Sequence, residues 1–314
     1  MKWIILIIAN IIFLSDTINL CAQYQPSIII HGGAGDFDSK SFVKEDYDAY
    51  YNTLYSVLSM GDSLLKSGAS AMDVAVACVA MMEDSPLFNA GKGAVYNAQG
   101  KHELDASVMD GSNLKAGSVA GITRVKNPVK AARMVMDNSQ HVMLAGKGAD
   151  EFAKKQGLQM VKNTYFDTPA MYQRYQKLVS GKKGTVGAVV LDSNGNLAAA
   201  TSTGGMMMKQ FGRIGDSPVI GAGTYADNAT CAVSCTGHGE YFIRFQAAYD
   251  IAAQMKYAGL TLFESCRNTI DKIGIAGGTG GVIAIDCNGN QVCRYNTKSM
   301  FRGSLWQGEI TVEF

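Results

Sequence analysis

One stretch decides the fold, GTVGAVVLDSNGNLAAATST at residues 184–203. Two apolar-rich runs, 185–192 and 196–203, flank the turn residues Ser193-Asn194-Gly195, and this pattern predicts a β-hairpin. Centring the turn on Asn194 places Thr185 opposite Thr203, and a two-residue turn at Asn194-Gly195 shifts the pairing by only one residue. Either register brings two threonine hydroxyls close together at the open end of the hairpin.

Thr185 is a candidate nucleophile if the chain is cut before it. A threonine hydroxyl needs a base beside it, and the α-amine of an N-terminal threonine is such a base. Its pKa is near 8 in model peptides, so the amine can be neutral close to physiological pH. Because Thr185 lies mid-sequence, the hypothesis requires cleavage between Gly184 and Thr185. The polar residues before it, 180–183, suit an exposed segment at a cleavage point.

Composition narrows the class of protein. The chain has 314 residues, 47% of them hydrophobic, enough for a sizeable core. Charged residues make up 18%, below the usual share of about a quarter, which argues against disorder. The net charge is +1 without a basic or acidic block, so we expect no nucleic-acid partner. Strands and helices follow one another in an order that suits an α+β sandwich better than a βαβ alternation.

The N-terminus has the pattern of a signal peptide. Met1-Lys2 is a short positive start, residues 3–14 are apolar, and a more polar exit ends at Ala22. A spanning helix needs about 20 apolar residues, which makes an anchor the weaker interpretation. We therefore expect a signal peptide over residues 1–22, cleavage after Ala22 and an exported protein, periplasmic or secreted, free of the membrane after processing. Six cysteines remain beyond it, and the sequence leaves open whether they form disulfides or are buried as small apolar residues.

Three glycine-bearing motifs each admit a functional and a structural interpretation. HGGAG at 31–35, after a short apolar strand, is either a substrate or oxyanion loop or an ordinary turn. GRIGDSP at 212–218 puts Arg213 near Asp216, a pair that can hold a zwitterionic amino acid or be a plain surface ion pair. TGHGE at 236–240, before a helix expected to run to about Tyr257, can offer backbone N–H groups to an oxyanion or simply cap that helix.

Several chemistries are excluded because their motifs are missing from the sequence. It contains neither G-x-S-x-G nor G-x-x-x-x-G-K-[ST], and its glycine clusters complete no dinucleotide fingerprint. Its four histidines are scattered without metal-ligand spacing.

Taken together, the motifs resemble those of the plant-type L-asparaginase/isoaspartyl peptidases in the N-terminal nucleophile hydrolase superfamily. Each piece is weak alone, but their shared order and spacing over nearly everything after residue 22 make the resemblance specific. The pieces are HGGAG 31–35, PLFNAG 86–91, ELDASVMDG 103–111, GTVGAV 184–189, TSTGG 201–205, GRIGDSP 212–218 and TGHGE 236–240.

The resemblance implies a four-layer αββα sandwich and a single hydrolase domain, 23–314, that cuts itself into an α chain, 23–184, and a β chain, 185–314. It also implies roles for particular residues. These are Thr185 as nucleophile, Thr203 as its assistant, Thr236 and the Gly237 N–H as the oxyanion hole with Gly239 nearby, Asn89 beside the nucleophile, Arg213 on the substrate α-carboxylate and Asp216 on its α-amino group.

By the same resemblance, catalysis needs no cofactor, and a structural sodium ion is held by backbone carbonyls of one loop. The loop residues are Met82, Glu83, Ser85, Phe88, Ala90 and Lys92. The resemblance further implies a small-molecule or dipeptide substrate, release of L-aspartate from isoaspartyl dipeptides and L-asparagine, and a dimer of cleaved αβ pairs. Two alternatives stay open: a glycosylasparaginase that cleaves GlcNAc-Asn, and a cleavage-defective binding protein of the same fold.

Overall fold

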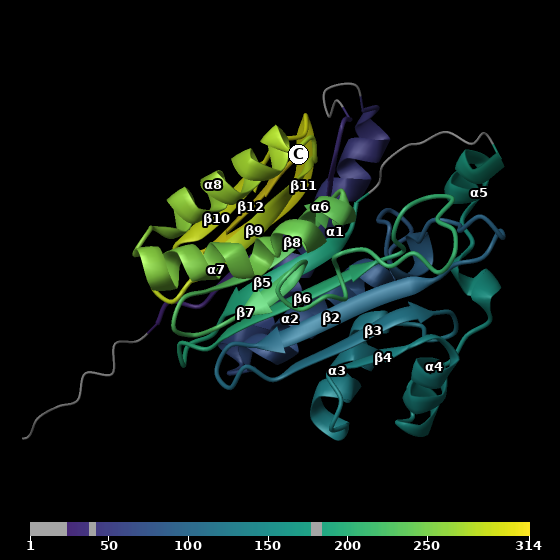
Figure 1. Ribbon diagram of the computed structural model, residues 1–314, viewed down its shortest axis with the longest axis horizontal. Coiled ribbons are helices and arrows are strands. Elements are labelled where there is room, and N and C mark those ends of the chain that lie inside the picture. The colour runs from purple at the N-terminus through teal and green to yellow at the C-terminus, as the bar shows by residue number, and fades with distance from the viewer. Residues whose placement is uncertain (1–23, 38–41, 177–183) are drawn as a thin grey trace, which may run out of the picture.

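The computed structural model describes residues 24–37, 42–176 and 184–314, so the predicted signal peptide lies outside the described residues. The described chain is a mixed α+β structure with two sheets (Figure 1). The eight-stranded sheet has the order β12 (Glu309–Glu313), β11 (Ser299–Trp306), β1 (Ser27–Gly35), β5 (Val186–Leu191), β6 (Leu197–Thr203), β2 (Leu104–Asp110), β3 (Ala116–Ile122), β4 (Met143–Ala145). The four-stranded sheet has the order β10 (Gln291–Tyr295), β9 (Gly280–Asp286), β8 (Cys231–Gly237), β7 (Thr224–Ala226). Neighbouring strands are antiparallel, apart from β3 and β4.

Helices pack against both sheets. The large sheet contacts α1 (Lys44–Lys66), α2 (Ala71–Glu83), α3 (Pro128–Asn138) and α4 (Gly146–Lys155). The small sheet contacts α7 (Ala247–Ala258) and α8 (Leu262–Ile275), with α6 (Gly239–Phe245) following directly on β8 (Figure 1). The turns η2 (Gly91–Gly93) and η3 (Asn163–Phe166) and helix α5 (Pro169–Gln176) complete the elements. Within the described ranges, no helix combines the length and apolar character that crossing a membrane demands.

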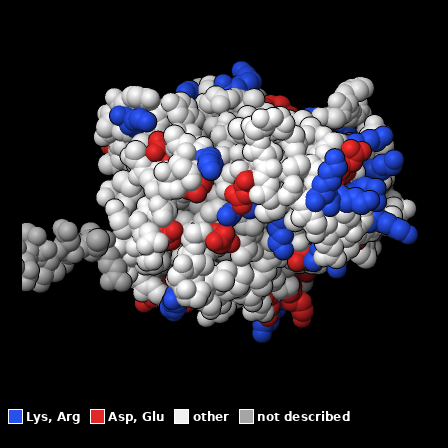
Figure 2. All heavy atoms as spheres, turned by 90° about the horizontal axis from the view of Figure 1, so that it is seen from below, with Lys and Arg blue, Asp and Glu red and all other residues white. Residues whose placement is uncertain are grey.

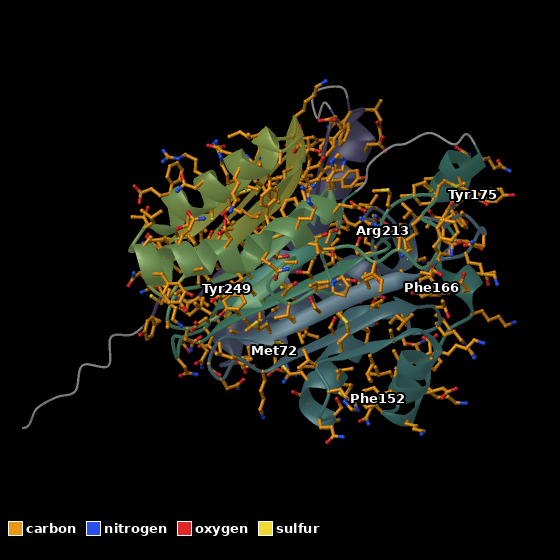
Figure 3. All side chains as sticks on the ribbon, viewed as in Figure 1. Met72, Phe152, Phe166, Tyr175, Arg213 and Tyr249 are labelled. Carbon is orange, nitrogen blue, oxygen red and sulfur yellow. The ribbon has the colours of Figure 1, made fainter. Side chains whose placement is uncertain are left out.

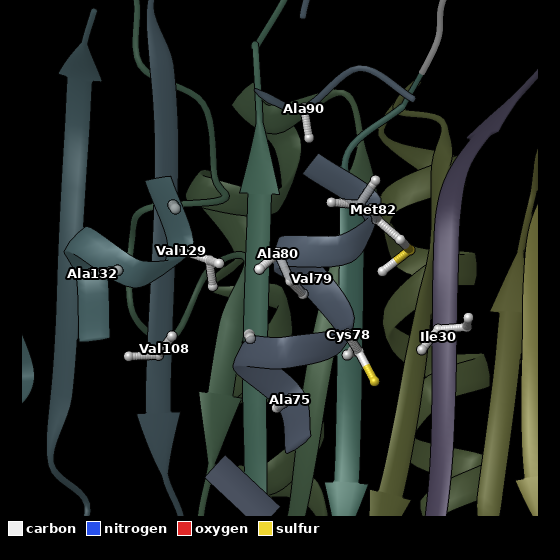
Figure 4. Packing of buried hydrophobic residues seen from close by; sticks show 14 of the residues in the cluster. Ile30, Ala75, Cys78, Val79, Ala80, Met82, Ala90, Val108, Val129 and Ala132 are labelled. Carbon is white, nitrogen blue, oxygen red and sulfur yellow. The ribbon is translucent and has the colours of Figure 1, made fainter. Parts of the chain in front are cut away.

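The central strands β1, β5 and β6 of the large sheet are buried along their whole length, which explains why they carry no Asp, Glu, Lys or Arg. On β1, Ile28 and Ile30 pack toward the helices, whereas Ile29 belongs to a separate cluster shared with the small sheet. Figure 4 shows Cys78 and Met82 of α2 lying across the strands of the large sheet. Successive residues of a strand point to opposite faces, so one strand serves two cores.

The structure confirms the predicted hairpin. Val186 lies opposite Ser202 and Leu191 opposite Leu197, so the turn is centred on Asn194. Continued by one residue, this register places Thr185 opposite Thr203. The α+β class is confirmed as well.

Two local expectations differ from the structure. The HGGAG run continues strand β1, where a turn or loop was expected, and its pairing with β11 shifts only between His31 and Gly33, where Gly32 has no partner. The helix expected to run to Tyr257 is two helices, because Gln246 adopts a left-handed conformation with φ 49° and separates α6 from α7. The six cysteines in the described part of the chain are all free.

Candidate active site

Seven of the residues predicted to form a site line one cavity of about 420 Å³, whereas Thr236 and Gly239 do not line it. The seven come from both sheets and from three loops, and Figure 3 shows Arg213 in the central part of the molecule. The predicted residues that line the cavity are Asn89, Gly184, Thr185, Thr203, Arg213, Asp216 and Gly237. The fold therefore collects seven residues that are widely separated in sequence.

Thr185 is almost fully buried at the start of β5. Its Oγ1 lies 3.5 Å from the hydroxyl oxygen of Ser217, which also lines the cavity. Its backbone carbonyl accepts a hydrogen bond of 3.0 Å from Nδ1 of His31. The segment before it packs tightly, because a Cβ on Gly33, whose φ is 108°, would collide with the backbone of Gly184.

Thr203 and Asn89 fix the backbone beside Thr185. The Thr203 hydroxyl accepts from the Gly205 N–H at 3.0 Å. The Asn89 side chain donates to the Gly205 carbonyl at 2.8 Å and accepts from the Val95 N–H at 3.0 Å. Both side chains therefore hold the wall of the cavity at Gly205.

The Thr236 hydroxyl is fully buried and has no hydrogen-bond partner among the described residues. It lies 2.8 Å from the position that a Cβ of Gly184 would occupy, so it faces the peptide just before Thr185. A buried donor without a partner costs about 1–3 kcal/mol. Such a group suits a site where an oxyanion will form, because the donor is already desolvated and in place.

Arg213 and Asp216 form the charged side of the cavity. The guanidinium makes an ion pair with Glu240 of α6, with Nη2 to Oε1 at 2.9 Å. Asp216 is buried, one of its carboxyl oxygens has no partner among the described residues, and burial raises its pKa to about 7. A Cβ on Gly239 would lie 2.9 Å from the Asp216 carboxyl and 3.0 Å from the Arg213 guanidinium, so this glycine leaves room between them.

Sequence reasoning missed a buried ion pair behind the cavity wall. Lys209 Nζ lies 3.9 Å from Oδ2 of Asp105, and Asp105 is paired with Thr203 across β2 and β6. Burial raises the pKa of Asp105 and lowers that of Lys209. Asp105 stands inside the ELDASVMDG motif, but only the strand pairing reveals that it lies next to Thr203. Ser217 and the contacts of His31 were missed for the same reason.

The loop predicted to hold sodium follows α2 and folds tightly on itself. The backbone carbonyls of Glu83, Pro86 and Phe88 crowd the positions that side chains of Gly91 and Gly93 would need. Carbonyl oxygens are ligands that hard cations accept, so the donor set fits a cation held by backbone alone. No group of three His, Cys, Asp or Glu side chains in the described ranges could hold a metal ion.

Comparisons with known proteins show the family to which the chain belongs. The profile of the asparaginase family matches residues 24–182 and 177–312. The isoaspartyl peptidase of Salmonella typhimurium is 48% identical over 302 residues, covering 90% of this chain and 96% of the relative. That of Escherichia coli is 47% identical over 302 residues, covering 90% and 93%. A probable isoaspartyl peptidase/L-asparaginase of Arabidopsis thaliana is 41% identical over 311 residues, covering 88% and 94%.

The chain belongs to the asparaginase family, and it is a hydrolase. The resemblance found from the motifs is thereby confirmed over most of the chain.

The same comparisons correct the prediction of export. The relatives that match over nearly their whole length are bacterial and eukaryotic isoaspartyl peptidases, and no signal peptide is evidenced for this chain. The prediction of a periplasmic or secreted protein, processed after Ala22, is therefore wrong on this evidence. It was based on the positive start, the apolar stretch 3–14 and the polar exit that ends at Ala22, and such a local pattern does not by itself fix where a protein resides.

Proposed function

We propose that the chain is an autoprocessed amidohydrolase that releases L-aspartate from isoaspartyl dipeptides and from L-asparagine, with Thr185 as its N-terminal nucleophile. One observation carries the proposal: Thr185 lies in the cavity directly after Gly184, whose backbone faces the unpartnered hydroxyl of Thr236. The names of the relatives support the choice of substrates.

Cleavage comes first in this mechanism. The Thr185 hydroxyl attacks the carbonyl carbon of Gly184, and the C–N bond breaks as the acyl group moves to oxygen. Water then hydrolyses the ester, leaving a Gly184 carboxylate and a free Thr185 amine. The products are two chains of one hydrolase domain, the first ending at Gly184 and the second beginning at Thr185.

Turnover uses the amine that cleavage has freed. The Thr185 α-amine takes the hydroxyl proton as Oγ attacks the side-chain carbonyl of the aspartyl substrate. The Thr236 hydroxyl and the Gly237 N–H stabilise the oxyanion, at roughly 3 kcal/mol for each donor. The proton passes to the leaving amine, and water then releases aspartate from the acyl-enzyme.

Recognition is the task of the charged side of the cavity. The Arg213 guanidinium binds the substrate α-carboxylate, and the ionised Asp216 binds the α-ammonium. An aspartyl unit inside a longer chain lacks these free groups and is rejected. Thr203 and Asn89 hold the cavity wall beside the nucleophile, and Gly239 keeps the space between the two charges open.

We further propose that the two sheets and their helices form the four-layer αββα sandwich of N-terminal nucleophile hydrolases, that two cleaved pairs form a dimer, and that the loop 82–92 holds a sodium ion as a structural element. The partner in catalysis is the small-molecule substrate and not an extended polyanion. On the face in Figure 2, acidic and basic side chains are interspersed, with a group of basic ones at its right-hand end.

Electrophoresis and a substrate panel test the proposal. Purified wild-type protein should run as two fragments, Thr185→Ala as one, and Thr185→Ser, which keeps a hydroxyl, should still cut. Free aspartate is then measured after incubation with L-asparagine, an isoaspartyl dipeptide and GlcNAc-Asn. An intact wild-type chain would refute the mechanism, and release from GlcNAc-Asn alone would replace the proposed substrates.

A further inference from the structure

A row of polar residues crosses the middle of the large sheet. His31, Gly187, Thr201 and Ser107 lie opposite one another in turn on β1, β5, β6 and β2. On the facing small sheet, Ser234 and Thr224 are also paired with each other. Each of the five side chains in the row and its facing pair, namely His31, Thr201, Ser107, Ser234 and Thr224, is fully buried.

These side chains form one continuous chain of contacts, which begins at the carbonyl of Thr185. Nδ1 of His31 lies 3.0 Å from the Thr185 carbonyl oxygen, and Nε2 of the same ring lies 2.9 Å from Ser234 Oγ. The Ser234 hydroxyl is 2.8 Å from that of Thr201, which is 2.5 Å from that of Thr224.

The far end of the chain is a second carbonyl. The Ser107 hydroxyl lies 2.8 Å from Thr224 Oγ1 and 2.5 Å from the carbonyl of Ser217. Thr185 and Ser217 are the two residues whose hydroxyls meet in the cavity. The chain of contacts therefore holds the backbone of both.

Gly187 makes room for the first part of this chain. A Cβ at this position would collide with Ser234 Oγ and with Nε2 of His31. Any side chain here would separate the ring from the hydroxyl. The second glycine of the G-T-V-G motif is thus explained by the His31–Ser234 contact.

The contact with a backbone carbonyl determines which nitrogen of His31 carries the proton. A carbonyl oxygen only accepts, so the 3.0 Å contact between Nδ1 and the Thr185 carbonyl needs a hydrogen on Nδ1. Burial lowers the pKa of His31 to about 3, so the ring is neutral at pH 7 and its Nε2 accepts from the Ser234 hydroxyl. Two side contacts, from Thr201 Oγ1 to the Gly223 carbonyl at 3.5 Å and from Thr224 Oγ1 to the Ser217 carbonyl at 3.4 Å, give the other hydroxyls further acceptors.

We propose that His31 is a positioning residue for Thr185, holding the carbonyl of the nucleophile with its Nδ1–H while the hydroxyl chain fixes the ring against the small sheet. The inference rests on the proposed function, because it assigns His31 a task only if Thr185 is the nucleophile. It acts through Thr185 and touches no substrate.

Two substitutions of His31 separate positioning from a merely structural role. Asparagine places an amide nitrogen near the site of Nδ1, and glutamine places one near the site of Nε2. A shift of the nucleophile by about 1 Å costs about 100-fold in rate, so His31→Gln should lower kcat by about that factor with KM unchanged, whereas His31→Asn should stay within about tenfold of wild type. Equal kcat values for both variants, or a change confined to KM, would overturn the inference.

A variant that leaves His31 in place tests whether its Nδ1–H bond depends on the far part of the hydroxyl chain. Thr201→Val removes the contacts of Thr201 with Ser234, Thr224 and the Gly223 carbonyl, but the Ser234 hydroxyl still donates to Nε2, so the Nδ1–H bond should persist. The matched control is Ser118→Ala, because Ser118 lies opposite Ser107 in the same buried row but donates to the carbonyl of Pro218. Thr201→Val should keep the wild-type kcat and unfold at no lower temperature than Ser118→Ala. A loss of kcat in Thr201→Val alone would contradict the assignment of the Ser234 hydroxyl as the group that holds the ring.

Nitrogen-15 NMR of the ring reads the tautomer directly. The chain has four histidines, and the His31 signal is the one missing in His31→Asn. It should carry its proton on Nδ1 and show no titration between pH 5 and 8, and a proton on Nε2 would refute the proposal.

The activity of Thr185→Ala separates a failure of this inference from a failure of the proposed function. If Thr185→Ala is as active as wild type, the proposed function itself fails. If Thr185→Ala is inactive and the two His31 variants behave alike, only this inference fails.

Discussion

Replacing Asp216 by asparagine should make the protein more stable and less active. The carboxyl is fully buried, and burial raises its pKa from 3.8 to about 7. At 1.36 kcal/mol per unit, that shift corresponds to about 4 kcal/mol. A raised pKa means that the protonated form stabilises the native state, fully below pH 3.8, and that this stability is lost as the pH rises through about 7. Asparagine cannot ionise, so Asp216→Asn should exceed wild type in unfolding free energy at pH 8 by up to about 4 kcal/mol.

Activity should move in the opposite direction. The substrate ammonium needs the ionised carboxylate, so wild-type kcat/KM should rise with pH through about 7. Losing a hydrogen bond to a charged group costs about 1.5–3 kcal/mol, which lowers kcat/KM by about 10- to 150-fold in Asp216→Asn above pH 7. The variant should also lack the part of the pH profile that Asp216 contributes, and keep the part that the Thr185 amine contributes near pH 8.

The assay pairs urea unfolding at pH 5 and 8 with aspartate release from an isoaspartyl dipeptide between pH 5 and 9. Asp192→Asn is the matched control, since Asp192 is a buried carboxylate that accepts backbone N–H bonds in the hairpin turn, outside the cavity. Its pH profile should be that of wild type. An Asp216→Asn enzyme with wild-type activity at pH 8, or one less stable than wild type there, would refute the reasoning.

Three further substitutions test other parts of the structure. Thr236→Val should lower kcat by about 100- to 1000-fold in steady-state assays, as removal of an oxyanion donor does elsewhere, and slow the cut after Gly184. Burial raises the pKa of Glu83 from 4.5 to about 8, so the stability that its protonated form contributes is complete below pH 4.5 and is lost progressively as the pH rises through about 8. Glu83→Gln should match wild type in melting temperature at pH 4.5 and exceed it at pH 9. Gly187→Ala should lower the unfolding free energy by about 1–3 kcal/mol, measured in urea, because the added carbon collides with Ser234.

The parts of the site that follow from local rules could be predicted from sequence. The hairpin register depends only on the turn at Asn194 and the runs beside it, so the approach of Thr185 to Thr203 follows directly. Arg213 and Asp216, which form the charged side of the cavity, are three positions apart in sequence, so one loop carries both. For these residues the local chemistry and the tertiary arrangement agree.

The rest depends on pairings that no local pattern contains. The contact between His31 and Ser234 needs β1 beside β5 and the two sheets face to face, a relation across 203 residues of sequence. Glycines at 31–35 suggest a turn, yet the strand continues because β11 pairs with it as far as Gly35. The break at Gln246 is equally hidden, since glutamine has no preference for a left-handed conformation.

The strand order of the large sheet has a consequence for the mature protein. Read by the proposed products, the order runs β12, β11 from the second chain, β1 from the first, β5, β6 from the second, and β2, β3, β4 from the first. The strands of the two proposed fragments alternate in the sheet. Separating the fragments would break the hydrogen bonds of three strand pairs, β11–β1, β1–β5 and β6–β2. In the proposed mechanism these strands pair within one chain before the cut, and after it the same pairing joins two chains. The stability of the cut protein then depends on its rate of unfolding, because refolding would require two separate chains to associate again.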